Sequence, residues 1–111
     1  MTMATTGIIG LYVQTRDFAA TSAFWRSLGY ETVFETDHGS GQLVHPGGGP
    51  YVFLDENRDG ELETHPILGV DDAATFPLPA TFTPEHWGMQ QAVLSDPDGR
   101  DVALQAPLSS G

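Results

Sequence analysis

The sequence predicts an α+β fold built from short strands and one clear helix. Three observations support this prediction. One segment has the composition and spacing of an amphipathic helix, several short apolar runs have the character of strands, and the order of elements in the first half starts again in the second. The length of 111 residues, 40% of them hydrophobic, suits a single domain, 1–111, with one core.

Residues 7–56 are predicted to form a first βαβββ module. Gly7 to Thr15 (GIIGLYVQT) is a short run rich in branched residues, which is typical of a strand. Asp17 is a suitable N-cap for the helix that follows, and Gly29 is a suitable end for it. We expect the apolar face of this helix to consist of Ala20, Phe24 and Leu28. Three further strands are predicted at 30–35, 43–44 and 51–54, separated by Gly-rich turns.

Residues 62–107 are predicted to form a second module after a strongly polar connection, Asp55 to Glu63 (DENRDGELE). Thr64 to Val70 is another apolar run, and two aspartates follow it much as Arg16-Asp17 follows the first run. At the end of the chain, two alternating runs flank Asp96-Pro97-Asp98-Gly99, where Pro and Gly stand as a type I turn requires. This pattern predicts a hairpin.

The segment between these two elements is rich in proline. Pro77, Pro79 and Pro84 exclude a long regular helix, so the second module is expected to have a short helix or none. One face of its sheet would then be thinly covered, and a partner subunit or an unusual loop could cover it. We therefore predict a homodimer.

Composition excludes several classes of function. Four Arg, no Lys and fifteen Asp plus Glu give a net charge of -11, which repels nucleic acid and anionic membrane surfaces but attracts cationic ligands. The absence of Cys excludes disulfides and thiol catalysis, and the absence of Lys excludes Schiff-base chemistry. No run approaches the roughly 20 apolar residues of a membrane span, and the first residues do not read as a secretory signal, so a soluble, cytoplasmic protein is expected.

The order of motifs resembles that of the vicinal oxygen chelate superfamily, which includes glyoxalase I, bleomycin-resistance proteins and extradiol dioxygenases. Within it, the first half is most similar to the bleomycin-resistance pattern of strand, Asp-Phe, helix with an aromatic pair, Leu-Gly-aromatic and strand. The residues that carry this resemblance are Asp17, Phe18, Phe24, Trp25, Leu28, Gly29, Tyr30, Trp87, Gly88 and Asp96 to Gly99. The resemblance implies two βαβββ modules whose strands form a half-open, cup-shaped mixed sheet.

The resemblance also implies where a metal would bind. Metalloenzymes of the superfamily place ligands at four strand positions, which fall on Gly10, Phe53, His65 and Ala103 of this chain. Only His65 can bind a metal, whereas a catalytic divalent site needs at least three protein ligands. A register shifted by two residues would replace Phe53 with Asp55 and give two ligands. We therefore expect no metal and no other cofactor.

A different cation site is suggested by Asp55-x-Asn57-x-Asp59-Gly60, which fits the first half of a calcium-binding loop. However, Pro66 stands where the closing Glu should be, and the flanking segments are predicted strands. We interpret Asp55 to Glu63 as an acidic connecting turn, with calcium binding left open as an alternative.

Strand alternation predicts the lining of the cup. The side chains expected there are aromatic or polar, as in many small-molecule pockets, or they fill the cup as a core. The predicted ligand-binding residues are Tyr12, Gln14, Tyr51, Phe53, Asp55, His65, Trp87 and Gln105, with Ile67 and Ala103 beside them. Trp87 is either a ligand-stacking residue at the rim or a hydrophobic plug.

Three functions are compatible with these observations. The preferred hypothesis is a metal-free protein that sequesters a planar or cationic drug-like molecule, as in antibiotic resistance of the bleomycin type, without catalysis. The alternatives are a metal-dependent glyoxalase-like lyase or related enzyme that uses His65 with ligands in a different register or from a second subunit, and a dimerisation or regulatory module with a filled cup.

Overall fold

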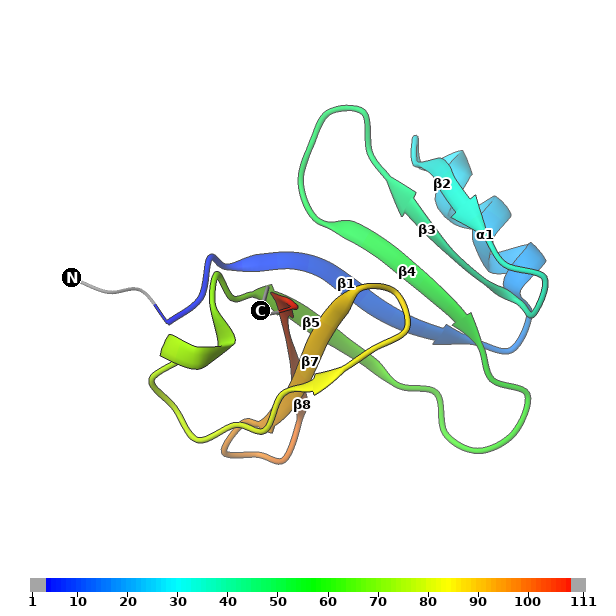
Figure 1. The fold of residues 1–111 in the computed structure, drawn as a ribbon. Coiled ribbons are helices and arrows are strands. Elements are labelled where there is room, and N and C mark those ends of the chain that lie inside the picture. Colours follow the sequence, from blue (N-terminus) through cyan, green and yellow to red (C-terminus); the bar gives the residue numbers. More distant parts are fainter. Residues whose placement is uncertain (1–3, 109–111) are drawn as a thin grey trace. The chain divides into compact units, whose positions relative to one another are not determined.

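The computed structural model describes residues 4–108, and it confirms the α+β class (Figure 1). Within this range the chain forms two compact units. One comprises residues 10–64, and the other comprises residues 4–9 together with 65–108. The terminal residues 1–3 and 109–111 of the predicted domain lie outside the described range.

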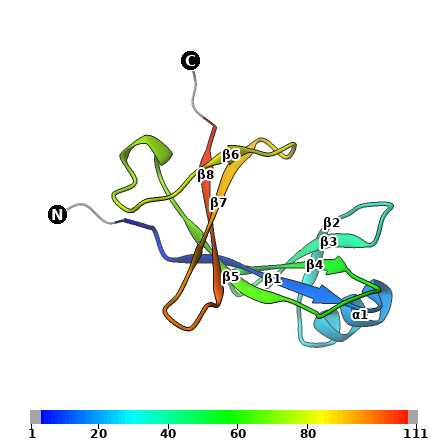
Figure 2. The same cartoon turned by 90° about the horizontal axis from the view of Figure 1, so that it is seen from below.

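The unit 10–64 contains the single α-helix found among residues 4–108. Its elements are β1 (Ile8–Thr15, which begins two residues before the unit), α1 (Phe18–Ser27), β2 (Glu31–Glu35), β3 (Ser40–Val44) and β4 (Tyr51–Glu56). Strand β1 pairs with β4 in parallel, and β4, β3 and β2 follow as antiparallel neighbours. Helix α1 lies along one face of this four-stranded sheet (Figures 1 and 2).

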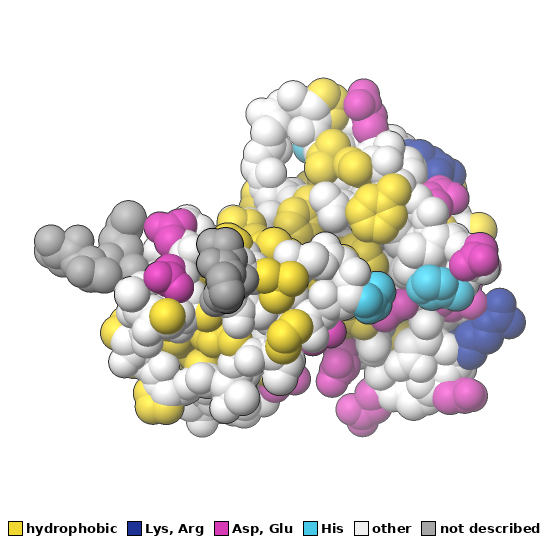
Figure 3. All heavy atoms as spheres, in the orientation of Figure 1, with side chains coloured by type: hydrophobic (Ala, Val, Ile, Leu, Met, Phe, Trp, Pro, Cys, Tyr) yellow, Lys and Arg dark blue, Asp and Glu magenta, His cyan; other side chains and the backbone are white. Residues whose placement is uncertain are grey.

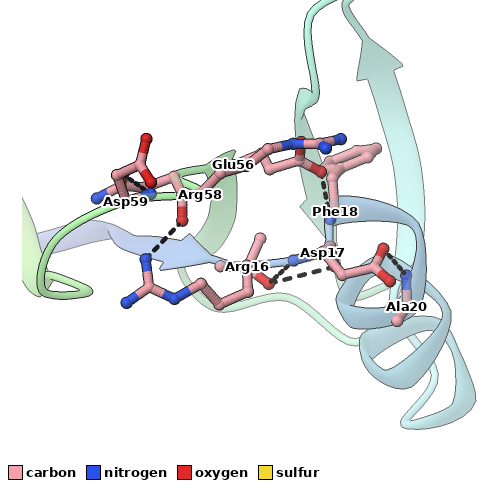
Figure 4. A network of polar contacts seen from close by, with 9 residues as sticks. Arg16, Asp17, Phe18, Ala20, Glu56, Arg58 and Asp59 are labelled. Carbon is pink, nitrogen blue, oxygen red and sulfur yellow. Dashed lines mark hydrogen bonds and ion pairs between the residues drawn. The ribbon is translucent and has the colours of Figure 1, made fainter.

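The start of α1 is fixed by side chains on both sides of its first turn, as the close view in Figure 4 shows. The Asp17 carboxylate accepts a hydrogen bond from the backbone N–H of Ala20 at 3.1 Å, which confirms the predicted N-cap. The Glu56 carboxylate, from the end of β4, accepts from the backbone N–H of Phe18 at 3.0 Å. The helix is therefore tied to the strand that it covers.

The predicted apolar face of the helix is wrong. Phe24 is 59% exposed and Leu28 is 54% exposed, whereas Phe18 and Trp25 pack against the buried core and Ser22 is buried. Residues 18, 22 and 25 also follow the spacing of one helix face, and the rings of Phe18 and Trp25 are the ones that lie against the core. The core below them consists of Leu43, Val52 and Leu54, with Val13 and Tyr30 at its edge.

The other unit repeats the same strand order. Its elements are β5 (Thr64–Gly69), η1 (Ala73–Thr75), β6 (Thr83–Pro84), β7 (Met89–Ser95) and β8 (Asp101–Pro107). Strand β5 pairs with β8 in parallel, and β8, β7 and β6 follow as antiparallel neighbours (Figure 2). Each unit thus pairs its first strand with its fourth, which confirms the predicted repetition of a mixed sheet.

The predicted hairpin joins β7 to β8. The Asp96 carboxylate accepts hydrogen bonds from the backbone N–H groups of Asp98 and Arg100, at 2.9 and 2.8 Å. Gly99 has a positive φ of 84°, a conformation that favours glycine. Seven residue pairs then follow in unbroken register from Ser95↔Asp101 to Met89↔Pro107.

The helix of the second unit is reduced to one short 3₁₀ turn, η1, as the prolines predict. The extended segment after it covers the sheet instead. Phe76 and Phe82 meet edge to face, with ring centroids 5.8 Å apart, and both pack on a core of Val70, Ala92, Leu104 and Ala106. The homodimer was predicted from a thinly covered face of this sheet. Because the loop covers that face, the homodimer stays a prediction without this argument.

Acidic side chains are spread over the face that Figure 3 shows and do not gather in one block. None of the helices formed by residues 4–108 has the length and apolarity needed to cross a membrane.

Candidate functional site

A row of aromatic side chains crosses the unit 10–64 on the face of its sheet opposite α1. The register aligns Phe34 with Gln42, Gln42 with Phe53, and Phe53 with Tyr12. The rings of Tyr12 and Phe53 are nearly parallel, at 10° and a centroid distance of 6.1 Å. Phe34, which is 45% exposed, lies 6.3 Å from Phe53 at an angle of 54°. Together with Tyr51, these residues form what we call the aromatic face.

A carboxylate lies beside this row. Asp55 is two residues beyond Phe53 on β4, so the alternation of the strand places it on the same face. The Tyr12 hydroxyl donates a hydrogen bond to Asp55 Oδ2 at 2.6 Å, and Gln14 Nε2 donates to the Tyr12 oxygen at 3.3 Å. Burial, followed by the hydrogen bond to Asp55, raises the pKa of Tyr12 to about 12. Tyr12 therefore keeps its proton at neutral pH and acts as a donor to Asp55.

Tyr51 occupies the space above a glycine at the other end of the row. It pairs with Gly10 across β1 and β4, and a Cβ added at Gly10 would lie 2.4 Å from Cζ of the Tyr51 ring. Burial raises the pKa of Tyr51. The half-buried ring therefore extends the aromatic face over a position that has no side chain of its own.

The four positions at which the resemblance implies metal ligands do not provide a ligand set. In the unit 10–64, Gly10 and Phe53 have no side-chain donor atom, and the rings of Tyr51 and Tyr12 lie against them. In the other unit, Ala103 is a buried apolar residue and His65 is half-buried on β5. The donor set at these positions is one imidazole, which does not fit a catalytic divalent ion. Among residues 4–108, no three His, Asp or Glu side chains are grouped as metal ligands.

The turn that resembles a calcium loop is organised around a guanidinium group. Arg16 donates a hydrogen bond to the carbonyl oxygen of Asn57 at 3.0 Å and another to that of Gly60. The carboxylate of Asp55 is directed to Tyr12, and the Asn57 amide donates to Gln14 Oε1 at 3.1 Å. This arrangement favours the interpretation as a connecting turn.

The structure brings together four of the eight predicted site residues through direct contacts: Tyr12, Gln14, Phe53 and Asp55. Tyr51 shares their face. The remaining three belong to the other unit. There Gln105 Nε2 donates to Gln91 Oε1 at 3.2 Å, and Trp87 is 48% exposed between β6 and β7 with its ring edge-on to His86. The roles predicted for His65, Trp87 and Gln105 stay predictions.

The sequence prediction omitted two members of this site. Phe34 alternates with Val33 in the β2 segment, but a shift of register between Thr32 and Phe34 hides its alignment with Phe53. Asn57 lies in the turn and was considered only as a calcium ligand. Its distance of 43 residues from Gln14 along the chain leaves no local signal of their contact.

Solved structures of similar fold cover almost the whole chain. Methylmalonyl-CoA epimerase from Mycobacterium tuberculosis aligns with a TM-score of 0.76 and 16% identity, over 98% of this chain and 93% of that one. A glyoxalase/bleomycin resistance protein/dioxygenase superfamily member from Vibrio splendidus 12B01 aligns with a TM-score of 0.66 and 17% identity, over 87% and 96%.

A larger protein contains the same fold as a part. The 2,2',3-trihydroxybiphenyl 1,2-dioxygenase from Sphingomonas wittichii strain RW1 aligns with a TM-score of 0.66 and 13% identity, over 96% of this chain and 42% of that one. No protein-family model and no curated protein sequence matches the chain. The likeness is therefore one of structure, and it agrees with the repeated strand order and the motifs. The chain has the fold of the vicinal oxygen chelate superfamily, the superfamily of glyoxalases, bleomycin-resistance proteins and extradiol dioxygenases.

Proposed function

We propose that this protein binds a planar aromatic cation on its aromatic face and acts by sequestering it, without chemical conversion. The observation that carries the proposal is the stacked pair of Tyr12 and Phe53 beside the Asp55 carboxylate. Aromatic rings favour planar ligands through offset stacking, and they favour cations through the negative charge of their faces. A neighbouring carboxylate adds a charge of the opposite sign to that of the ligand.

The charge of the whole chain supports a cationic ligand. A net charge of -11 attracts cations over a distance set by ionic strength, which is about 10 Å at 0.1 M salt. Binding by this mechanism should weaken as salt is added. A neutral planar ligand of the same size should show little salt dependence.

The fold by itself does not select this function, because the same architecture supports unrelated activities. The solved structures of similar fold include an epimerase and a dioxygenase, so different activities occur on it. The choice rests on the residues of this chain. At the metal-binding positions of the superfamily stand a ring-covered Gly10 and a stacked Phe53, which favour an apolar binding surface over metal chemistry.

The proposal is tested by titrating the protein with 9-aminoacridine, a planar cation, and measuring its fluorescence and the heat of binding. We expect saturable binding that weakens with salt and recovery of the unchanged probe by chromatography. Phe53→Ala should weaken binding by about five- to 150-fold, because base-sized rings stacked on aromatic side chains contribute roughly 1–3 kcal/mol each. Phe24→Ala removes an exposed ring from α1 and serves as the matched control with unchanged affinity.

Absence of binding at millimolar probe would contradict the proposal and would favour a module with a filled cup. The metal-dependent alternative has its own readout, since ligand binding to the folded state raises the melting temperature. After chelator treatment, a rise with nickel, zinc, iron(II) or manganese that is lost in His65→Ala would make the enzyme hypothesis the leading one.

A further inference from the structure

A chain of hydrogen bonds connects the acidic turn to the aromatic face, and every bond in it has a fixed direction. It contains Asn57 from the turn, Gln14 and Tyr12 from β1, and Asp55 from β4. We call these four residues the relay. An amide or a hydroxyl can both donate and accept, so the direction of such a chain is set by groups at its ends that have only one role.

Backbone N–H groups fix the two amides. The N–H of Asp59 donates to Asn57 Oδ1 at 3.2 Å, so the other atom of this amide, Nδ2, faces Gln14 as a donor. Gln14 Oε1 accepts from Asn57 Nδ2 and also from the backbone N–H of Glu63 at 3.0 Å. Its amide nitrogen is therefore directed at Tyr12.

The two amides leave one possible direction for the hydrogen bond that the Tyr12 hydroxyl donates. Its oxygen accepts from Gln14 Nε2, so its proton goes to Asp55 Oδ2, at 2.6 Å. The high pKa of Tyr12 agrees with a hydroxyl that retains its proton. Arg16 holds the turn in place through the carbonyl groups of Asn57 and Gly60, so the start of the relay is also fixed.

The relay ends on a carboxylate whose second oxygen, Oδ1, accepts no hydrogen bond from the residues that the structure describes. A carboxylate only accepts hydrogen bonds. Because the orientations of the other relay groups are fixed, none of them can present a donor to the ligand at this position. Reversing one amide would put two donors or two acceptors face to face along the chain. The polarity of the site is thus set by the backbone of the turn 57–63.

We propose that the relay restricts the ligand to aromatic cations that carry an N–H donor, such as protonated ring nitrogens, amidines or aryl ammonium groups, and selects against cations of equal charge without one. This inference rests on the proposed function and specifies its ligand class. A charge-assisted hydrogen bond to Asp55 Oδ1 is available to the first class only. Quaternary aromatic cations retain stacking and charge attraction alone.

The test compares two probes of similar shape and equal charge, 9-aminoacridine, which has N–H groups, and 10-methylacridinium, which has none. We expect the wild-type protein to bind 9-aminoacridine at least about tenfold more tightly. Asp55→Asn should bring this ratio close to one, because the substituted amide directs its oxygen to the Tyr12 proton and its NH₂ group toward the ligand. Asp59→Asn also removes one negative charge, from the turn beside Asp55, but leaves the backbone N–H of residue 59 in place, and it should keep the ratio.

Tyr12→Phe provides a second variant in which the charge of the site is unchanged. It keeps the ring stacked on Phe53 but removes the proton that orients Asp55, so the ratio should fall while 10-methylacridinium binds as before. Thermal melts of all variants verify that they are folded. Equal affinity of the wild-type protein for both probes, or an Asp55→Asn variant that keeps the ratio, would overturn the inference and leave the proposed function intact. Failure of both probes to bind would overturn both.

Discussion

The two units have the same strand order, but different segments pack on one face of each sheet. The comparison shows what a βαβββ module requires. In the unit 10–64, the ten-residue helix α1 packs Phe18 and Trp25 on the sheet. In the other unit, a three-residue 3₁₀ turn and an extended segment place Phe76 and Phe82 on the equivalent strands. The sheet therefore requires apolar side chains over one face, and helical backbone is only one way to deliver them.

If the loop of the second unit packs as tightly as helix α1, truncating a core leucine should destabilise both units equally. Leu54 on β4 and Leu104 on β8 are fully buried leucines of the fourth strand of each unit, at 0% and 1% exposure. We expect Leu54→Ala and Leu104→Ala each to lower the free energy of unfolding by about 2–5 kcal/mol in urea denaturation. A loss below about 1 kcal/mol for Leu104→Ala would show that the loop collapses into the cavity and is not a fixed cover.

The helix and the 3₁₀ turn should differ in their dependence on a cap. Asp17 accepts from the N–H of Ala20, and Asp72 accepts from the N–H of Ala74 at 3.0 Å. Asp17→Ala should cost about 1 kcal/mol, because it exposes the first turn of a ten-residue helix. Asp72→Ala should cost less than about 0.5 kcal/mol, because ring packing holds this segment. Equal costs for the two variants in chemical denaturation would contradict this distinction.

Low pH should lower the stability of both units through one carboxylate in each. This effect should be smaller than those of core truncation and of cap removal. The N–H of Phe18, followed by Arg58, holds the pKa of Glu56 below its usual 4.5, and Arg100 holds the pKa of Asp96 below its usual 3.8. A lowered pKa in the folded state stabilises the protein above the unfolded value, and this contribution is lost as the pH falls through the folded value. Both carboxylates are half-buried at the surface, whereas their partners Arg58 and Arg100 are exposed, so solvent screens each pair and the effect is small.

We therefore expect melting temperatures to fall as the pH drops below about 4, and Glu56→Gln or Asp96→Asn to flatten the curve. Each variant should also melt slightly earlier than the wild-type protein at pH 7. A curve that keeps its slope in the double variant would assign the acid sensitivity to other carboxylates.

Local signals predicted the parts of the fold that depend on neighbours in the chain. The turn at Asp96 to Gly99, the N-cap Asp17 and the absence of a second helix all follow from residues within a few positions of each other. The helix face was predicted wrongly because two sets of residues share the same period. Only contacts with the sheet distinguish Phe18 and Trp25 from Phe24 and Leu28.

The sequence pattern predicted which residues share the face of the candidate site. It did not predict the long-range hydrogen bonds and the strand register that bring them into contact. Alternation placed Tyr12, Phe53 and Asp55 on one face, as the structure does. The bond from Arg16 to the carbonyl of Asn57 joins residues 41 positions apart, and the register shift before Phe34 has no marker in the sequence. Such contacts depend on the pairing of β1 with β4, which local patterns do not specify.

The ring of Tyr51 over Gly10 couples the residue types that these two positions can hold in evolution. Any residue with a Cβ at position 10 would meet this ring at 2.4 Å, so a metal ligand there requires the ring to turn away or be replaced. That change removes part of the aromatic face. A side chain at position 10 therefore comes with a displaced Tyr51 ring, and the two positions have to change together.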